Sequence, residues 1–414
     1  YEISACLVGS EMCIRDRICS TRNPNCLSTR RMRCLPGTLK SLLMPSPRPE
    51  TAPDFLLSRA SGSVRTQGTT STFIEPWDAV AALQRREVNM VVGALPFDRD
   101  APAALTVPEQ IITEAGTLQP HSYYREGPGA QLHAAVAGYD PEPHEHLRRV
   151  EAAVDTICNS ILDKVVLARS VDFVFDPPVD PRLVAARLIE LSSTRDGFIA
   201  DLTPAGKPGH MIVGSSPELL IRKQGLEITS YPLAGSAPRI FDDEDADRAA
   251  GEKLYNSTKD LDEHSYVVEH IRDILTPLCR ELTIPDRPVL DRTNEMWHLA
   301  TPIKGVLYDP APSALDLATR LYPTPAVCGS PQYAAEALIT TAETDRSFYA
   351  GTVGWCDSHG DGEYMVSIRC AEVNGDGTAA RAWAGGGLVA ASKPEEELAE
   401  TTAKLLTIQR ALGL

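Results

Sequence analysis

YAGTVGWCDSHGDGEYMVSIRCAEV, residues 349–373, is the stretch that decides the fold class. It contains two runs rich in β-branched and aromatic residues, at 349–356 and 363–373, and such runs are typical of strands. Between them stands Asp-Ser-His-Gly-Asp-Gly, a composition that favours a tight hairpin connection. Because a connection this short joins antiparallel neighbours, this part of the chain predicts an antiparallel sheet.

Further strand-like runs lie on both sides of this hairpin. KVVLARSVDFVF (164–175) alternates with a period of two, and MVVGALPFD (90–98) predicts a buried strand that runs into a turn. Apolar residues at helical spacing predict helices at 141–162, 259–275 and 394–412. Since the strands cluster instead of alternating strictly with helices, the sequence predicts an α+β fold with antiparallel sheets.

Composition sets limits on the kind of protein. The chain has 414 residues, of which 43% are hydrophobic and 23% charged, and this is enough for a well-buried core. A run of about 18 apolar residues, which a membrane-spanning helix needs, is missing from the sequence. The net charge of −16 argues against a nucleic-acid partner. We expect a globular protein of the cytoplasm that binds neither nucleic acid nor membrane.

The beginning of the chain differs from the rest. Residues 1–43 hold seven Lys or Arg against three Asp or Glu, and five of the ten cysteines. Their opening, EISACLVGSEMCIRDR, resembles translated adapter read-through, so we expect 1–43 to be a non-native or disordered extension. Without it the net charge becomes about −20. We expect a loosely ordered leading segment at 44–68, rich in Pro, Ser and Arg, and a single domain at 69–414 with its catalytic core at about 141–410.

The remaining cysteines are scattered and form no CxxC pair, which fits a reducing compartment. They are Cys158, Cys279, Cys328, Cys356 and Cys370. Small buried hydrophobic residues are the commoner role for such cysteines.

Several carboxylates and one lysine are candidates for chemistry. Glu397 and Glu400 are three residues apart on a predicted helix and project from one face, with Glu263 on another helix. An isolated pair of this kind usually faces water, but a third carboxylate and an anionic ligand would make a magnesium site. Lys164 opens an otherwise apolar strand, either as an edge lysine or as a base with a lowered pKa. Glu218 follows a proline and precedes two leucines, either on a surface turn or as an acid with a raised pKa.

Glycines and two single residues complete the candidates. AGGGLV (384–389) lacks the spacing of a phosphate loop, so its glycines let the backbone approach a ligand or form a bend. His298 and Arg369 are single residues outside any motif, and for such residues a structural role is the commoner one.

Taken together and in order, these segments resemble the chorismate-utilising enzymes, most closely the isochorismate synthases. The resemblance spans about residues 70–412 and rests on eight segments. They are DKVVLARS (163–170), GSSPELLIRK (214–223), YPLAGSAPR (231–239), KDLDEHSYVV (259–268), MWHLATPIKG (296–305), LYPTPAVCGSP (321–331), GTVGWCDSHGDGEYMVSIRC (351–370) and AGGGLVAASKPEEELAETTAKL (384–405).

The resemblance implies a fold, a reaction and a site. The fold would be a sandwich of large antiparallel sheets with helices outside. The enzyme would use Mg²⁺ to add water at C2 of chorismate with loss of the C4 hydroxyl, for siderophore or menaquinone synthesis, as a monomer without a glutaminase subunit. Lys164 would be the base and Glu218 the acid. The implied metal ligands are Glu263, Glu400 and Glu397, and the implied substrate-binding residues are Gly235, His298, Ala326, Ile368, Arg369, Gly385 and Lys404.

The chain departs from the family pattern at a few positions, which leaves alternatives open. It has Tyr322 and Val327 where isochorismate synthases often carry His and Leu, and Ala390 where they carry Pro. The small Ala326–Val327 pair suits water as the nucleophile, although the smaller valine could allow some elimination of pyruvate. The alternatives are a salicylate synthase, an anthranilate or aminodeoxychorismate synthase, and an inactive chorismate-binding protein.

Overall fold

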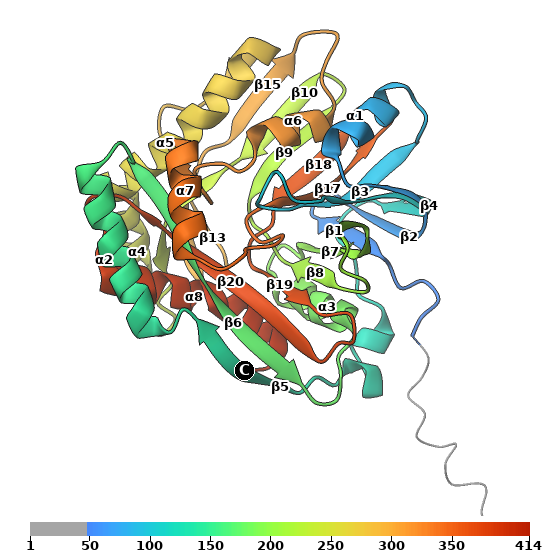
Figure 1. Ribbon diagram of the computed structural model, residues 1–414, viewed down its shortest axis with the longest axis horizontal. Helices are drawn as coiled ribbons and strands as arrows, with labels where there is room; N and C mark the ends of the chain where they lie inside the picture. Colours follow the sequence, from blue (N-terminus) through green and yellow to red (C-terminus); the bar gives the residue numbers. More distant parts are fainter. Residues whose placement is uncertain (1–47) are drawn as a thin grey trace, which may run out of the picture. The chain divides into compact units, whose positions relative to one another are not determined.

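Two long neighbouring strands, β6 (Lys164–Phe175) and β20 (Ala379–Leu388), lie near one edge of the larger sheet in the computed structural model, which describes residues 48–414 (Figure 1). They pair antiparallel from Val165 opposite Leu388 to Val174 opposite Ala379. The strand predicted at 164–175 is thereby confirmed. Its alternation is also observed, because Val165 and Val171 pack toward helices and Ala168 packs toward the opposite face.

The larger sheet is one series of antiparallel neighbours. From β20 the series continues through β19 (Cys370–Val373), β8 (Met211–Gly214), β7 (Gly197–Asp201), β1 (Phe55–Arg59), β2 (Gly62–Phe73), β4 (Ala104–Glu114), β3 (Met90–Leu95), β17 (Thr352–Asp357), β18 (Gly362–Val366), β9 (Leu219–Gln224), β10 (Glu227–Tyr231), β15 (Ile303–Leu307) and β12 (Cys279–Thr283). On its other side β6 pairs with β5 (Ala134–Asp140) and β16 (Gly329–Ser330). The hairpin predicted from residues 349–373 is the pair β17 and β18.

A smaller sheet and the helices surround this series. The smaller sheet has the order β11 (Leu233–Pro238), β14 (Met296–Ala300) and β13 (Val289–Arg292). The α-helices are α1 (Pro76–Gln84), α2 (Pro143–Asn159), α3 (Pro181–Leu191), α4 (Glu244–Tyr255), α5 (Thr258–Leu275), α6 (Ala314–Leu321), α7 (Gln332–Ala342) and α8 (Pro394–Leu412). The short 3₁₀ turns are η1 (Ser122–Tyr124), η2 (Pro128–Ala130), η3 (Thr203–Ala205) and η4 (Thr276–Leu278).

The strand series folds back on itself around the main core. That core joins Ala168 and Phe198 from one end of the series to Val92 and Tyr364 from the other. A second core lies between β6, β20 and helices α3 and α8, and a third lies between β6 and helices α2 and α7. The predicted α+β sandwich with helices on the outside is therefore confirmed. Within residues 48–414, none of the helices is both long and apolar enough to cross a membrane.

The prediction of a loosely ordered segment at 44–68 is wrong for residues 55–68. Strand β1 and the start of β2 lie there, and Phe55 and Leu57 are buried because β1 lies between β2 and β7. The Pro-rich residues before Phe55 hid this apolar strand. The extension at 1–43 and the residues up to 47 lie outside the described part of the chain, and the described residues form one compact unit.

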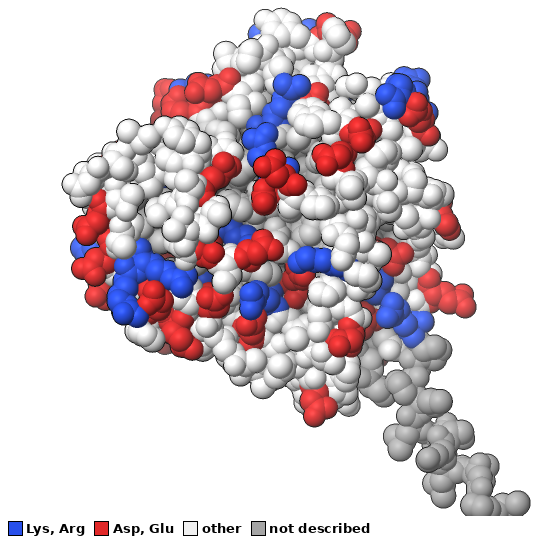
Figure 2. Space-filling model, viewed as in Figure 1, with Lys and Arg blue, Asp and Glu red and all other residues white. Residues whose placement is uncertain are grey.

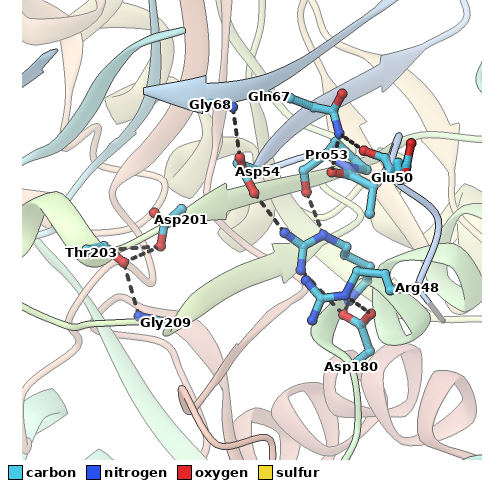
Figure 3. A network of polar contacts seen from close by, with 12 residues as sticks. Arg48, Glu50, Pro53, Asp54, Gln67, Gly68, Asp180, Asp201, Thr203 and Gly209 are labelled. Atoms are coloured by element: carbon cyan, nitrogen blue, oxygen red, sulfur yellow. Dashed lines mark hydrogen bonds and ion pairs between the residues drawn. The ribbon is translucent and has the colours of Figure 1, made fainter. Parts of the chain in front are cut away.

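Polar contacts hold the residues that precede β1 (Figure 3). The Asp54 carboxylate accepts from the Gly68 amide at 3.1 Å and from the Arg182 guanidinium at 2.9 Å. Arg182 also donates to the Pro53 carbonyl at 2.6 Å, and Arg48 pairs with Asp180 at 3.1 Å. This network joins the leading residues to β2 and to the start of α3.

Candidate active site

A cavity lies where β20, the smaller sheet, α5 and α8 meet. Of the twelve residues that the sequence predicted for the site, ten line this cavity. They are Glu218, Gly235, Glu263, His298, Ala326, Ile368, Arg369, Gly385, Glu400 and Lys404. The tertiary structure thus brings together residues that are up to 186 positions apart in the chain.

Lys164, the first residue of β6, lies behind the cavity wall and is completely buried. Its ammonium donates to the Pro325 carbonyl at 2.6 Å and lies 3.3 Å from Oε1 of Glu263. Strand alternation explains its direction, because Lys164 shares its face of β6 with Val166, which lines the cavity. The edge-lysine interpretation is therefore wrong for this residue, since an edge lysine points to water.

Glu218 lies just before β9 and is only 2% exposed. Burial raises the pKa of Glu218 to about 8, although the Leu233 amide and the charges of Lys164 and Lys404 act in the opposite direction. A carboxyl with this pKa is mostly protonated at neutral pH, so it can donate a proton. The surface-turn interpretation is wrong, because the residue is buried and its backbone carbonyl accepts from the Val366 amide of β18 at 3.1 Å.

Three glutamates near the cavity are each paired with a lysine. Lys164 contacts Glu263, the Lys259 ammonium lies 2.7 Å from Oε1 of Glu397, and Lys404 lies 2.6 Å from Oε1 of Glu400. Glu397 is 1% exposed and does not line the cavity. Burial and the neighbouring Glu400 raise the pKa of Glu397, because two carboxylates this close resist ionising together.

Burial would also raise the pKa of Glu400, but its own cationic and hydroxyl partners outweigh that effect. Lys404 and the Ser236 hydroxyl, which donates to Oε1 at 2.7 Å, lower the pKa of Glu400 below its usual value. One glutamate of the neighbouring pair is therefore held ionised, whereas Glu397 takes up a proton more readily.

The glycines of AGGGLV make room for these carboxylates. They lie in the regular strand β20, so the bend that the sequence allowed is not their role. A methyl group on Gly387 would lie 2.0 Å from Oε1 of Glu263, and one on Gly386 would lie 2.9 Å from Oε2 of Glu397. A bare backbone is required here because two acidic side chains lie directly against it.

Cations and a neutral histidine line another part of the cavity. Arg369 has a left-handed backbone (φ 51°), a conformation that costs energy for a non-glycine residue and that is often found at functional sites. Lys404, on α8, also donates to the Gly385 carbonyl at 2.8 Å. Burial lowers the pKa of His298 far below its usual value, so this ring is neutral, and its buried Nε2 has no partner in the described part of the chain.

The donor set has the chemistry that a magnesium ion prefers, but its side chains are turned toward lysines. Within residues 48–414, no three His, Cys, Asp or Glu side chains are arranged to hold a metal ion. Carboxylate oxygens are nevertheless the ligands that Mg²⁺ favours. Oε2 of Glu397 is buried without a hydrogen-bond partner among the described residues, and it lies directly against the backbone of Gly386. These residues therefore fit a magnesium ion once the lysine contacts exchange.

Sequence reasoning missed several residues of the site. Ser236 and Lys259 lie inside the segments YPLAGSAPR and KDLDEHSYVV. The family resemblance singles out these segments but assigns no role to the two residues. Tyr349 and Trp383 line the cavity and stack with ring centroids 5.8 Å apart. Single aromatic residues in strand-like runs carry no signal that separates a cavity wall from a core.

The face in Figure 2 shows how charge is distributed on one side of the molecule. Acidic and basic side chains are interspersed over it, and no continuous basic area is visible there. Inside the cavity, the positive charges available to an anionic ligand are those of Arg369 and Lys404.

Comparison with known proteins agrees with this site. The family described as chorismate binding enzyme matches residues 84–413. A Mycobacterium tuberculosis protein provisionally named isochorismate synthase MenF is 43% identical over 366 residues, which are 87% of this chain and 96% of that protein. Isochorismate synthase DhbC of Bacillus subtilis is 42% identical over 329 residues, 78% of this chain and 81% of its own length. The solved structure of MenF, the menaquinone-specific isochorismate synthase from Escherichia coli, has a TM-score of 0.74 at 25% identity and covers 88% of this chain and 89% of its own.

The chain belongs to the family of chorismate binding enzymes. Relatives over most of its length carry the name isochorismate synthase, and this confirms the class of enzyme that the eight segments predicted.

Proposed function

We propose that this protein converts chorismate to isochorismate by adding water at C2 and removing the C4 hydroxyl. The observation that carries the proposal is Glu218, a buried carboxyl in the cavity whose pKa of about 8 keeps it protonated at neutral pH. Protonation turns the departing hydroxide into water, which is a much better leaving group. Lys164, in its deprotonated amine form, is the base that takes a proton from the attacking water and becomes an ammonium, and the two residues exchange roles in the reverse reaction.

The dianionic substrate is held by charge on both sides. Arg369 and Lys404 bind one carboxylate with charge-assisted hydrogen bonds. Glu263, Glu400 and Glu397 would hold a magnesium ion, which would supply positive charge to the other carboxylate. Gly235, His298, Ala326, Ile368 and Gly385 shape the pocket.

Water is the nucleophile because the wall at Ala326 and Val327 is apolar and small. The chain supplies this whole site by itself, so it acts without a glutaminase subunit that delivers ammonia. The product serves siderophore or menaquinone synthesis, and the Escherichia coli relative of solved structure is itself described as menaquinone-specific.

The test uses purified protein lacking residues 1–43, chorismate and Mg²⁺, with products separated by chromatography. Isochorismate without added ammonia is the expected product. Salicylate together with pyruvate as the main products would contradict the proposal in favour of a salicylate synthase. A requirement for ammonia would contradict it in favour of an anthranilate or aminodeoxychorismate synthase.

A second experiment separates chemistry from binding. Lys164→Ala and Glu218→Gln should each lower kcat by roughly 10²- to 10⁴-fold, the usual contribution of an acid or a base, while the dissociation constant of chorismate changes little. If both variants lose binding instead, these residues shape the pocket and do not carry out the proton transfers.

A further inference from the structure

A buried ion pair, Glu343–Arg346, lies beside the strand that begins with Lys164. Arg346 donates to both carboxylate oxygens, from Nε to Oε2 and from Nη2 to Oε1, each at 2.7 Å. The two side chains are only 6% and 1% exposed, and neither lines the active-site cavity. Burying two charges is costly unless additional hydrogen bonds satisfy them, so the remaining contacts of the pair indicate its role.

One side of the pair fills a gap in the edge of β6. On this edge β16 pairs with Lys164 and Val165, and β5 pairs with Ser170–Phe175, which leaves 166–169 without a partner strand within the described residues. The Ala168 amide donates to Oε1 of Glu343 at 2.7 Å, and the Val166 carbonyl accepts from Nη2 of Arg346 at 2.7 Å. The Val166 amide donates to the Cys328 carbonyl at 2.7 Å, so the ion pair takes the place of a partner strand at the Val166 carbonyl and the Ala168 amide.

The other side of the pair holds the loop that contacts Lys164. Nη1 of Arg346 donates to the Val327 carbonyl at 2.8 Å. Two residues earlier in the same loop, the Pro325 carbonyl accepts the hydrogen bond from the Lys164 ammonium at 2.6 Å. The Arg346 guanidinium thus connects two backbone positions. One is Val166, two residues after Lys164, and the other is Val327, two residues after Pro325.

This arrangement is a closed ring of contacts around the Lys164 side chain. The ring runs from the strand through Arg346 to the loop, and from Pro325 back to the ammonium. The guanidinium also lies 4.5 Å from the centre of the Phe97 ring, which restricts its movement. Because the planar fork of arginine binds two carbonyls and a carboxylate at fixed angles, the spacing between strand and loop is fixed as well.

We propose that Glu343–Arg346 is a positioning pair that sets the place of the Lys164 ammonium by fixing the loop 324–327 against β6. The pair touches neither substrate nor metal, and it acts through the two backbone segments. This inference rests on the proposed role of Lys164 as the base. An error of about 1 Å in the placement of a reacting group can reduce a rate by about 10²-fold.

The test compares Arg346→Lys and Glu343→Gln with a control variant at another ion pair that contacts strand β6. Lysine keeps the charge but has no fork, and glutamine keeps the shape of Glu343 without its charge. The control is Arg381→Lys, because Arg381 makes a bidentate pair with Asp172 between β20 and β6, at 2.6 and 2.9 Å, outside the active-site cavity. For each protein, kcat and KM for chorismate are measured together with the melting temperature.

The expected result is a fall in kcat of at least about tenfold for Arg346→Lys and Glu343→Gln, with KM within about threefold of the unmodified enzyme. Arg381→Lys should keep both constants. A lower melting temperature with unchanged kcat, or a rise in KM alone, would overturn the inference. Should Arg346→Lys fail to fold, Glu343→Gln decides by the same criterion. No isochorismate from the unmodified protein would overturn the proposed function and this inference with it.

Discussion

At the scale of single residues, burial gives the site its chemistry. Glu218 and Lys164 are ordinary side chains in the sequence, and each is enclosed by elements that are distant along the chain. Lys164 is fully buried and ion-paired with Glu263, whereas Glu218 has a pKa of about 8 because desolvation dominates its surroundings. The same burial that keeps Glu218 protonated at neutral pH also makes it a cost to the fold at higher pH.

Glu218→Gln should change the pH dependence of stability. The folded protein keeps the proton up to about pH 8, whereas the unfolded chain releases it near pH 4.5. The contribution of the buried carboxyl to the free energy of unfolding is complete below pH 4.5. It then decreases by up to about 1.4 kcal/mol per pH unit as the pH rises toward 8. Urea unfolding at pH 5, 6, 7 and 8 should therefore show the free energy of unfolding shifting in favour of the variant. A constant difference between the two proteins would mean that Glu218 ionises normally.

Gly387→Ala should remove activity without unfolding the protein. The added methyl group would lie 2.0 Å from Oε1 of Glu263, and that carboxylate must turn away from Lys164. We expect kcat to fall at least about tenfold, while the melting temperature changes by only a few degrees because the displaced group is the end of a flexible side chain. Gly138→Ala, in strand β5 at a position with open space and without a left-handed backbone, tests the general effect of such a change. Normal activity of the Gly387 variant would place Glu263 outside the reaction.

At the scale of elements, two helices present charge to the end of a strand. Helix α5 carries Lys259 and Glu263, and α8 carries Glu397, Glu400 and Lys404, all near the glycines of β20. Each of the three glutamates is paired with a lysine, so the charges of the cluster balance in the absence of a metal ion. Binding a divalent cation requires these lysine contacts to be exchanged.

Lys259→Gln should strengthen the binding of Mg²⁺. Without the ammonium that contacts Glu397, the clustered carboxylates repel one another more strongly and gain more from the metal. We expect the Mg²⁺ concentration for half-maximal activity to fall roughly threefold to tenfold, equivalent to about 1 kcal/mol. The matched control is Lys393→Gln. It removes an exposed ion pair with Glu396, which lies next to Glu397 on α8. An unchanged or higher Mg²⁺ requirement would show that Lys259 does not compete with the metal.

At the scale of the whole molecule, the described residues that precede β1 are part of the fold. Arg48, Pro53 and Asp54 contact Asp180 and Arg182, and β1 lies between β2 and β7 in the strand series. The cavity, in contrast, is lined only by residues from Val166 onward. Stability and catalysis are therefore expected to respond to different truncations.

Removal of residues 1–43 should leave kcat and the melting temperature unchanged. Removal of 1–54 should instead lower the melting temperature by several degrees, because the partly buried contacts of Arg182 with Asp54 and Pro53 are worth about 1 to 3 kcal/mol together. Calorimetry of both proteins, with activity measured at 25 °C, tests this difference. Equal melting temperatures would mean that the network in Figure 3 contributes little to stability.

The sequence by itself determined the fold class, the long strand at 164–175, the hairpin at 357–362 and the family. Local patterns suffice for these features because alternation, turn composition and helical spacing act between near neighbours. It also named ten residues that meet in one cavity, through the order of the eight segments. It missed β1, because the Pro-rich residues before it masked a short apolar run.

Only the tertiary structure decided the environments. Whether Lys164 points to water or to a carboxylate, whether Glu218 is exposed or buried, and why Gly387 must be glycine depend on segments far away in the chain. The Glu343–Arg346 pair is of the same kind, since its role follows from a gap in a sheet edge. Desolvation and close packing arise from contacts between distant residues, and no local pattern encodes them.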